Sequence, residues 1–307
     1  MIHFWDFGKY KWDGVIENLI TYYNIGLIYD IIIEIGVVNM NKEYIVDCHM
    51  HTLTKDEFNI YMKTACADKY INIRGLYIDE MLDPYDFEEF IDNDNMYFID
   101  SIDLNDVDSE LIKVEEDLKK YPRIIAVKIY LGYQKYYAND EKIFKVAEFA
   151  NNHHLSVTFH CGEIYDDNGE SSYSPYSDAK FIEDLAKKYP KVNFIASHIN
   201  WPNFDSLFYL CNKYDNFYTC FSGCNDGENI KEREKQNKLI ADTINKYFDI
   251  YPSVKNKVMY GTDFFAVSDE YSDVSSYIKV MDMLNVDEKE KKDILYNNVC
   301  RAYNTNF

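Results

Sequence analysis

The pattern of apolar and polar residues changes at about residue 40. Before that point, from Asp13 onward, apolar residues recur every three or four positions, which is the period of an amphipathic helix. They are Ile16, Leu19, Ile20, Tyr23, Leu27 and Ile31. Residues 1–40 are therefore predicted to form a short helical N-terminal extension that packs on the main body or on a partner subunit.

After Met40 the chain alternates between short apolar runs, rich in β-branched and aromatic residues, and longer segments of helical period. The apolar runs are 44–48, 71–78, 96–102, 124–130, 155–160, 192–197, 217–221 and 258–261. The helical segments include 107–120, 141–152, 178–188, 204–214 and 229–251. Continuous apolar runs are typical of strands buried on both faces, as in a parallel sheet with helical crossovers. Eight such strands predict an α/β fold, an eightfold β/α barrel over residues 41–307.

Polar side chains gather at the ends of these predicted strands, where a β/α barrel holds its active site. The strand-end residues are His49, His51, His160, Glu163, His198 and Asp263. Alternate residues on a strand share a face, so His49 and His51 can hold one metal ion, while Cys48 is expected to point away. Neutral imidazole suits zinc and similar ions. Each residue alone is more often a core or loop residue, and only their convergence predicts a metal site.

Lys128 lies inside the apolar fourth strand, where an unpaired ammonium is costly to bury. Three interpretations stay open: the side chain reaches solvent or an acidic loop, it contacts a substrate carboxylate, or it is carbamylated and bridges two metal ions. Tyr130, which follows in the same strand, and Glu163 are further candidates for substrate contact. The aromatic segment 164–176, with Tyr165, Tyr173 and Tyr176, is expected either to cover the pocket or to pack as a simple loop.

This ordered set of motifs resembles the amidohydrolase superfamily, in particular its branch of predicted metal-dependent hydrolases with a TIM-barrel fold. The motifs are Asp-Cys-His-Met-His at 47–51, Val-Lys-Ile-Tyr at 127–130, Val-Thr-Phe-His at 157–160, Ala-Ser-His at 196–198, Gly-Thr-Asp at 261–263, and the closing segment 294–302. The resemblance covers about residues 43–305. It implies that the metal is held by His49, His51, His160 and Asp263. It also implies that His198 binds a second metal, or touches the substrate or the attacking water, and that Lys128 is carbamylated if two metals are present.

The expected function is metal-dependent hydrolysis of a C–N or C–O bond, in an amide, lactone or ester of a small polar molecule. One divalent ion, most simply Zn²⁺, would lower the pKa of a water molecule to about 7. Asp263 would act as general base and then acid, and His198 would polarise a carbonyl. Two alternatives stay open: a metal-dependent non-oxidative decarboxylase of the same superfamily, and a barrel that no longer catalyses and serves as a binding or scaffold protein.

Composition narrows the partners. The chain has 32 basic and 53 acidic residues, a formal net charge of −21. This charge disfavours nucleic acid and anionic membranes as partners, because both bind basic patches. It also disfavours a metal-dependent nuclease or phosphodiesterase, whose substrate would be a polyanion. The seven cysteines are scattered, and Cys220 and Cys224 lack a second pair to complete a metal site. With no pattern typical of a signal peptide, we expect a cytoplasmic protein with a small-molecule substrate, compatible with a homo-oligomer.

Overall fold

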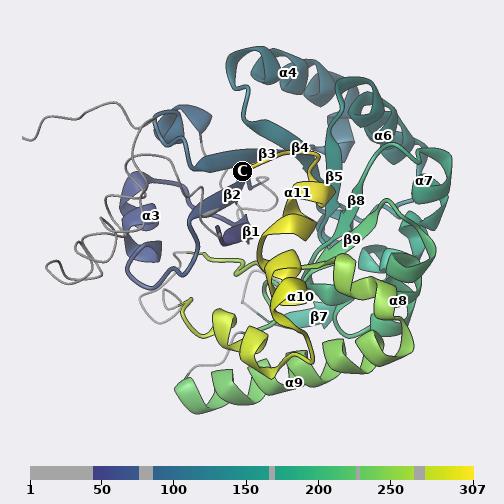
Figure 1. Ribbon diagram of the computed structural model, residues 1–307. Helices are drawn as coiled ribbons and strands as arrows, with labels where there is room; N and C mark the ends of the chain where they lie inside the picture. Colours follow the sequence, from purple (N-terminus) through teal and green to yellow (C-terminus); the bar gives the residue numbers. More distant parts are fainter. Residues whose placement is uncertain (1–43, 76–85, 166–169, 226–228, 266–273) are drawn as a thin grey trace, which may run out of the picture. The chain divides into compact units, whose positions relative to one another are not determined.

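The computed structural model describes residues 44–75, 86–165, 170–225, 229–265 and 274–307 (Figure 1). Residues 44–307 form one compact unit. The helical extension predicted over residues 1–40 lies outside the described residues.

Eight parallel strands form one sheet, and each overlaps one of the apolar runs of the sequence. They are β1 (Val46–Met50), β2 (Lys69–Ile73), β3 (Met96–Ser101), β4 (Ile124–Ile129), β5 (Ser156–Phe159), β8 (Phe194–Ala196), β9 (Phe217–Cys220) and β10 (Val258–Met259). Their spatial order is the order in the chain, as in a β/α barrel. The predicted fold class is therefore confirmed.

Backbone hydrogen bonds between β1 and the chain around β10 close the sheet. The Cys48 N–H donates to the Tyr260 carbonyl at 3.2 Å, and the His51 N–H donates to the Phe264 carbonyl at 2.8 Å. Between them, the Asp263 N–H donates to the His49 carbonyl at 2.7 Å. Because β10 itself is short, these bonds complete the barrel, and they also fix Asp263 beside His49.

Helices flank the strands, outside the sheet or at an end of the barrel (Figure 1). They are α3 (Lys55–Tyr61), α4 (Val107–Lys120), α5 (Leu131–Gln134), α6 (Glu141–His153), α7 (Glu183–Lys188), α8 (Phe204–Lys213), α9 (Ile230–Ile250), α10 (Glu288–Lys292) and α11 (Asn298–Ala302). The five predicted helical segments correspond to α4, α6, α7, α8 and α9, with a 3₁₀ turn, Ala179–Ile182, leading into α7. Within the described residues, no helix has both the length and the apolar character needed to cross a membrane.

Several short elements escape the apolar pattern, among them α3 and an antiparallel pair of strands. α3 is short and begins with a capping box, in which Thr54 accepts from the Glu57 N–H and the Glu57 side chain accepts from the Thr54 N–H. The second is an antiparallel pair, β6 (Glu163–Tyr165) and β7 (Ser171–Tyr173), in a segment expected to be a loop. Both strands are short, β7 is exposed and β6 is only half-buried, so no apolar run marks them.

The barrel interior is one buried cluster that draws on alternate residues of the strands. Its strand residues are Val46, Cys48, Ile71, Ile73, Ile99, Ala126, Ile195, Tyr218, Cys220 and Met259. Val299, Ala302 and Tyr303, from α11 and the residue after it, belong to the same cluster. α11 therefore closes one end of the barrel (Figure 1). The carboxyl ends of the strands lie at the opposite end, where a site can form.

β1 departs from strict alternation, because its register with β2 shifts between Asp47 and Met50. Cys48 packs inside the barrel with Cys220, and His49 also contacts Cys220. The expectation that Cys48 points away from the side of the histidines is therefore wrong. The irregularity lets consecutive residues of β1 both face the interior.

Tyr303 offers a test of how much the α11 end stabilises the barrel. Tyr303→Ala should lower the free energy of unfolding by about 3–5 kcal/mol, the usual range for truncating a buried aromatic side chain. Tyr303→Phe keeps the ring and loses only a long 3.5 Å contact with the Thr158 hydroxyl, so it should cost less than about 1 kcal/mol. Urea denaturation followed by circular dichroism measures both. Equal losses in the two variants would contradict a packing role for the ring.

Candidate metal centre

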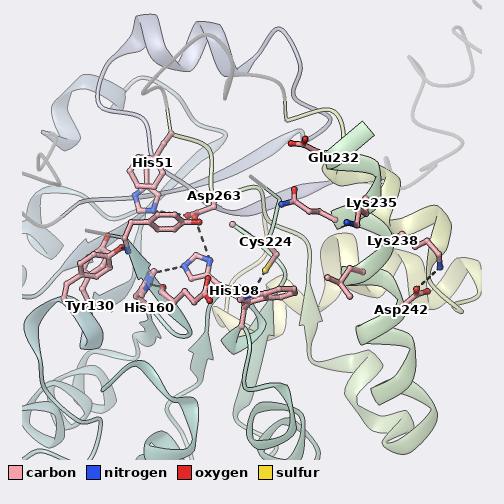
Figure 2. A pocket seen from close by; sticks show the side chains of 18 residues that line it. His51, Tyr130, His160, His198, Cys224, Glu232, Lys235, Lys238, Asp242 and Asp263 are labelled. Atoms are coloured by element: carbon pink, nitrogen blue, oxygen red, sulfur yellow. Dashed lines mark hydrogen bonds and ion pairs between the residues drawn. The ribbon is translucent and has the colours of Figure 1, made fainter. Parts of the chain in front are cut away.

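Residues from four strand ends meet in one place (Figure 2). Asp263 Oδ1 lies 3.1 Å from His49 Nε2 and 3.4 Å from His51 Nε2, and the two Nε2 atoms are 3.3 Å apart. The potential ligand atoms of these three residues all lie within 4.8 Å of one another. Two nitrogens bound tetrahedrally to one zinc ion at its usual bond length stand roughly 3.3 Å apart. The three side chains therefore fit a common divalent ion.

His160 and His198 form a second pair next to the first group. His198 Nε2 lies 3.1 Å from His160 Nδ1, and His198 Nδ1 lies 3.8 Å from Asp263 Oδ2. The rings of His49 and His198 are 5.0 Å apart between centroids. Asp263 thus stands between the pair and the β1 histidines, with one oxygen toward each. The structure thus brings all five predicted ligand residues together in two groups. His49, His51 and Asp263 form the first group, and His160 lies closest to His198 in the second.

Backbone carbonyls fix which nitrogen of each ring carries the hydrogen. His51 Nδ1 lies 2.9 Å from the Ile73 carbonyl, and His198 Nδ1 lies 2.9 Å from the Ser222 carbonyl. His160 Nε2 lies 2.8 Å from the Glu163 carbonyl. Because a carbonyl only accepts, these nitrogens donate, and the other nitrogen of each ring presents a lone pair toward the centre. Contacts of this kind orient histidines in metal sites.

Burial sets the protonation states. It lowers the pKa of both His51 and His198 to about 4, and it holds the pKa of His160 well below its usual value. For Asp263, burial raises the pKa, but the adjacent His198 and His49 outweigh it and hold the pKa well below its usual value. Near pH 7 these three imidazoles are neutral and the carboxylate is ionised. Those are the forms that bind a divalent metal.

Lys128 is fully buried beneath this cluster. Its Nζ lies 3.5 Å from His49 Nε2 and 3.2 Å from Ser197 Oγ, and burial lowers its pKa to about 8. The interpretation in which Lys128 reaches solvent is therefore wrong. Its side chain does not line the cavity above the site, whereas Tyr130 and Glu163 do.

Asp47 clamps β1 to the segment that carries Asp263. Its buried carboxylate accepts from the Thr262 N–H and hydroxyl at 3.0 and 2.6 Å, and from the Tyr61 hydroxyl at 2.8 Å. The His49 N–H donates a further bond at 3.2 Å. Burial raises the pKa of Asp47 to about 6, and the four hydrogen bonds oppose that rise. Asp47 therefore holds the residues on which the site depends without facing the centre itself.

The sequence motifs did not single out Ser222 and Gly223, which follow β9 after Phe221. Ser222 Oγ lies 3.2 Å from His49 Nδ1 and 3.3 Å from His198 Nδ1, so one hydroxyl contacts a histidine of each group. Gly223 has φ +64°, and a Cβ there would lie 2.4 Å from Asp263 Oδ2. Both residues follow the apolar run 217–221, so the strand-end rule that identified the histidines could also have found them.

The backbone is strained where it presents these groups. His198, Ile199 and Asn200 have φ values of 60°, 43° and 54°, and Asp263 has φ 60°. Left-handed conformations of non-glycine residues cost of the order of 1–3 kcal/mol each, and they persist where the surroundings hold them. The Asn200 side chain helps to stabilise this conformation. It accepts a hydrogen bond from the Ala179 N–H at 3.0 Å and donates one to the Asn203 carbonyl at 2.6 Å.

A cavity of about 930 Å³ opens above the cluster (Figure 2), a size that accommodates a small molecule. Its aromatic wall residues are Tyr130, Tyr133, Tyr165, Trp201 and Phe265. Phe265 stacks on His51 with 4.2 Å between ring centroids. Of the three tyrosines expected over the pocket, Tyr165 lines it, whereas Tyr173 bonds Asp178 and Tyr176 packs on Tyr137.

Comparison with known proteins agrees with the barrel fold. A family model described as Amidohydrolase matches residues 86–305. The structure of a probable 2-pyrone-4,6-dicarboxylic acid hydrolase from Acinetobacter baumannii is 13% identical with a TM-score of 0.56, covering 85% of this chain and 99% of that one. The 5-carboxyvanillate decarboxylase from Sphingomonas paucimobilis is 13% identical with a TM-score of 0.55, covering 82% of each chain.

A third structure, an amidohydrolase from Burkholderia multivorans with bound zinc, is 11% identical with a TM-score of 0.57, covering 85% of this chain and 99% of that one. At such identities the three structures show a shared fold. The comparison with curated proteins gave no sequence match.

Gly223 tests the packing of the cluster. Gly223→Ala places a methyl group 2.4 Å from Asp263 Oδ2 and 2.7 Å from His198 Nδ1, and it strains a backbone at φ +64°. We expect binding of Zn²⁺ to weaken by at least about tenfold while the far-ultraviolet circular dichroism stays that of the wild type. Titration against a competing chelator measures the affinity. Cys224→Ala, which removes atoms at the next residue, is the control, and equal affinity in both variants would refute the packing argument.

Ser222 tests the orientation of the histidines. Ser222→Ala removes the hydroxyl beside His49 and His198, and binding of Zn²⁺ should weaken about tenfold to a hundredfold. Ser156→Ala is the matched control, because it removes a buried serine hydroxyl that bonds the Ala302 carbonyl instead. The same chelator competition applies. If both variants bind Zn²⁺ as the wild type does, the Ser222 hydroxyl does not orient the ligands.

Proposed function

Because this chain belongs to the amidohydrolase family, we propose that it is a metal-dependent hydrolase acting on a C–N or C–O bond of a small polar molecule. The bond would be that of an amide, a lactone or an ester. The family membership supports an enzyme of this class, and the arrangement at the strand ends supports the dependence on a metal.

The convergence of hydrogen-bond acceptors supports the metal most directly. The inward nitrogens of His51, His160 and His198 carry lone pairs, because the outward nitrogens donate to carbonyls. The Asp263 carboxylate only accepts. Acceptors that face one another at 3.1–3.4 Å repel unless a cation lies between them. The donor set of neutral imidazoles and one carboxylate is one that zinc binds, and we propose Zn²⁺.

His49, His51 and Asp263 would hold the first ion, and His160 and His198 would hold a second ion or face the substrate. A bound divalent ion supplies Lewis acidity and lowers the pKa of water to about 7. Asp263 is placed to take the proton, because its side chain is 20% exposed and lines the cavity. It can then return that proton to the leaving group. His198 also lines the cavity, where it would bind the second ion or touch the substrate or the attacking water.

Lys128 decides the number of ions in this proposal. As an ammonium it donates to Ser197 and repels a cation near His49. Reaction of its neutral form with carbon dioxide would replace the ammonium by a carbamate, an anion that two ions can share. One ion with a free amine, and two ions with a carbamate, are the two states that this site allows.

Removal of the β1 histidines tests the proposal. We expect the wild type to contain one or two equivalents of divalent metal by elemental analysis, and the double variant His49→Ala plus His51→Ala to contain less than about a tenth of that. Hydrolysis of a panel of amides, lactones and esters should vanish with the metal, return when Zn²⁺ is restored to chelator-treated wild type, and stay absent in the variant. His153→Ala is the control, because His153 is exposed and stacks on Phe149.

The same panel separates the reaction classes. Unchanged metal content in the double variant would contradict the assigned site. Release of carbon dioxide from aromatic carboxylates, with no hydrolysis, would assign a decarboxylase on the same site. Bound metal without turnover of either substrate class would favour a binding protein.

A further inference from the structure

We propose that Tyr133 is a positioning residue, which fixes the orientation of His160 from the wall of the cavity. It acts through the contact of its ring with the imidazole and through a hydrogen bond that holds β6. The proposal rests on the proposed function for what His160 then binds, a second ion or the substrate, whereas the orientation itself does not. Three observations carry it: the carbonyl that His160 bonds, the contacts that hold that carbonyl, and the packing of the two rings.

The carbonyl that orients His160 lies outside the frame of the barrel. The carbonyls of Ile73 and Ser222, which orient two other imidazoles of the cluster, lie at the end of β2 and shortly after β9. His160 Nε2 instead donates to the Glu163 carbonyl at 2.8 Å. Glu163 begins β6, which belongs to the separate two-stranded sheet. The orientation of His160 therefore depends on how β6 is held.

Contacts with α5 hold β6 against the barrel. The Tyr165 N–H donates to the Tyr133 hydroxyl at 3.1 Å. Beside this bond, Ile164 packs so closely on Gly132 that a Cβ at Gly132 would lie 2.6 Å from Ile164 Cγ2. β6 also pairs with β7, but β7 is an exposed strand of three residues. Because α5 follows β4 at the strand end, its contacts tie the Glu163 carbonyl to the barrel.

The Tyr133 ring also contacts the imidazole that this carbonyl orients. The two ring centroids are 5.1 Å apart with 64° between the planes, an edge-to-face contact. Tyr130 lies nearly parallel to His160 at 6.2 Å, and the ring of His198 lies at 4.7 Å. An imidazole that is bounded by rings and bonded at its outward nitrogen keeps its inward lone pair toward the centre. Tyr133 contributes to both restraints, since it touches the ring and holds the strand that supplies the carbonyl.

Two simpler roles for Tyr133 make different predictions. Tyr130 and, packed on it, Tyr133 line one side of the cavity, and residues of α9 line the other (Figure 2). Contact with the substrate alone would leave His160 unaffected when the Tyr133 hydroxyl is removed. Packing of the ring in the fold alone would loosen all the histidines alike. A selective effect on His160 therefore distinguishes positioning from both.

Hydrogen exchange at the imidazole N–H groups measures this selectivity. It is followed by ¹H–¹⁵N spectra of histidine-labelled protein, chelator-treated and zinc-loaded, with the His160 signal assigned by its loss in His160→Gln. Tyr133→Phe keeps the ring and removes the bond to β6, so it should speed exchange at His160 Nε2–H about threefold to tenfold. Tyr133→Ala, which also removes the ring, should speed it further. Exchange at His51 and His198 should stay within about twofold of the wild type in both variants.

Tyr137→Phe and Tyr137→Ala are the matched controls. Tyr137 lies three residues beyond α5, and its ring packs on Tyr176 and Phe181 instead. Both controls should leave exchange at every histidine as in the wild type. Unchanged exchange at His160 in both Tyr133 variants would overturn the proposal. So would equal acceleration at all the histidines, which would show a general loosening of the fold.

Kinetics separates positioning from substrate contact. On an ester or amide that the wild type hydrolyses, Tyr133→Phe should lower kcat about threefold to tenfold and leave KM within about twofold, because a misoriented His160 impairs the chemical step. A raised KM with unchanged kcat, together with unchanged exchange at His160, would assign Tyr133 to substrate contact and overturn the proposal. If no ester or amide is hydrolysed, the proposed hydrolysis fails, while a selective change in exchange at His160 still supports the positioning role.

Discussion

The structure depends on one electrostatic constraint: lone pairs and a carboxylate face one another where water is largely excluded. His49, His51 and Asp263 stand within 3.4 Å of one another, and His160 and His198 stand 3.1 Å apart. Buried acceptors that face one another are costly, and a divalent cation among His49, His51 and Asp263 would relieve the repulsion between them. The surrounding fold can be understood as the framework that enforces this arrangement.

Three features enforce it. The bonds that close the barrel join His49 to Asp263 through the backbone, and Asp47 holds the adjacent Thr262. Carbonyls fix the outward nitrogens of three imidazoles. Gly223 leaves room where a side chain would collide with Asp263. The backbone at residues 198–200 adopts a strained left-handed conformation, and this conformation places the His198 side chain at the centre.

Much of this could be predicted from the sequence, because a parallel barrel shows itself as buried apolar runs with polar residues at their ends. His49, His51 and Asp263 could be placed together on that ground. What could not be predicted depends on three-dimensional contacts. No sequence pattern marks the shifted register of β1, which places Cys48 inside the barrel. None marks the contacts of the Ser222 hydroxyl with two histidines either. The lining from α9 follows from how a helix packs over the barrel mouth.

The most direct test of the central claim is anomalous diffraction at the zinc edge from crystals of the zinc-loaded protein. The account predicts an anomalous peak within bonding distance of His49 Nε2, His51 Nε2 and an Asp263 oxygen, with a second peak at His160 and His198 only if Lys128 carries a carbamate. Full zinc occupancy elsewhere, with no peak among His49, His51 and Asp263, would contradict it.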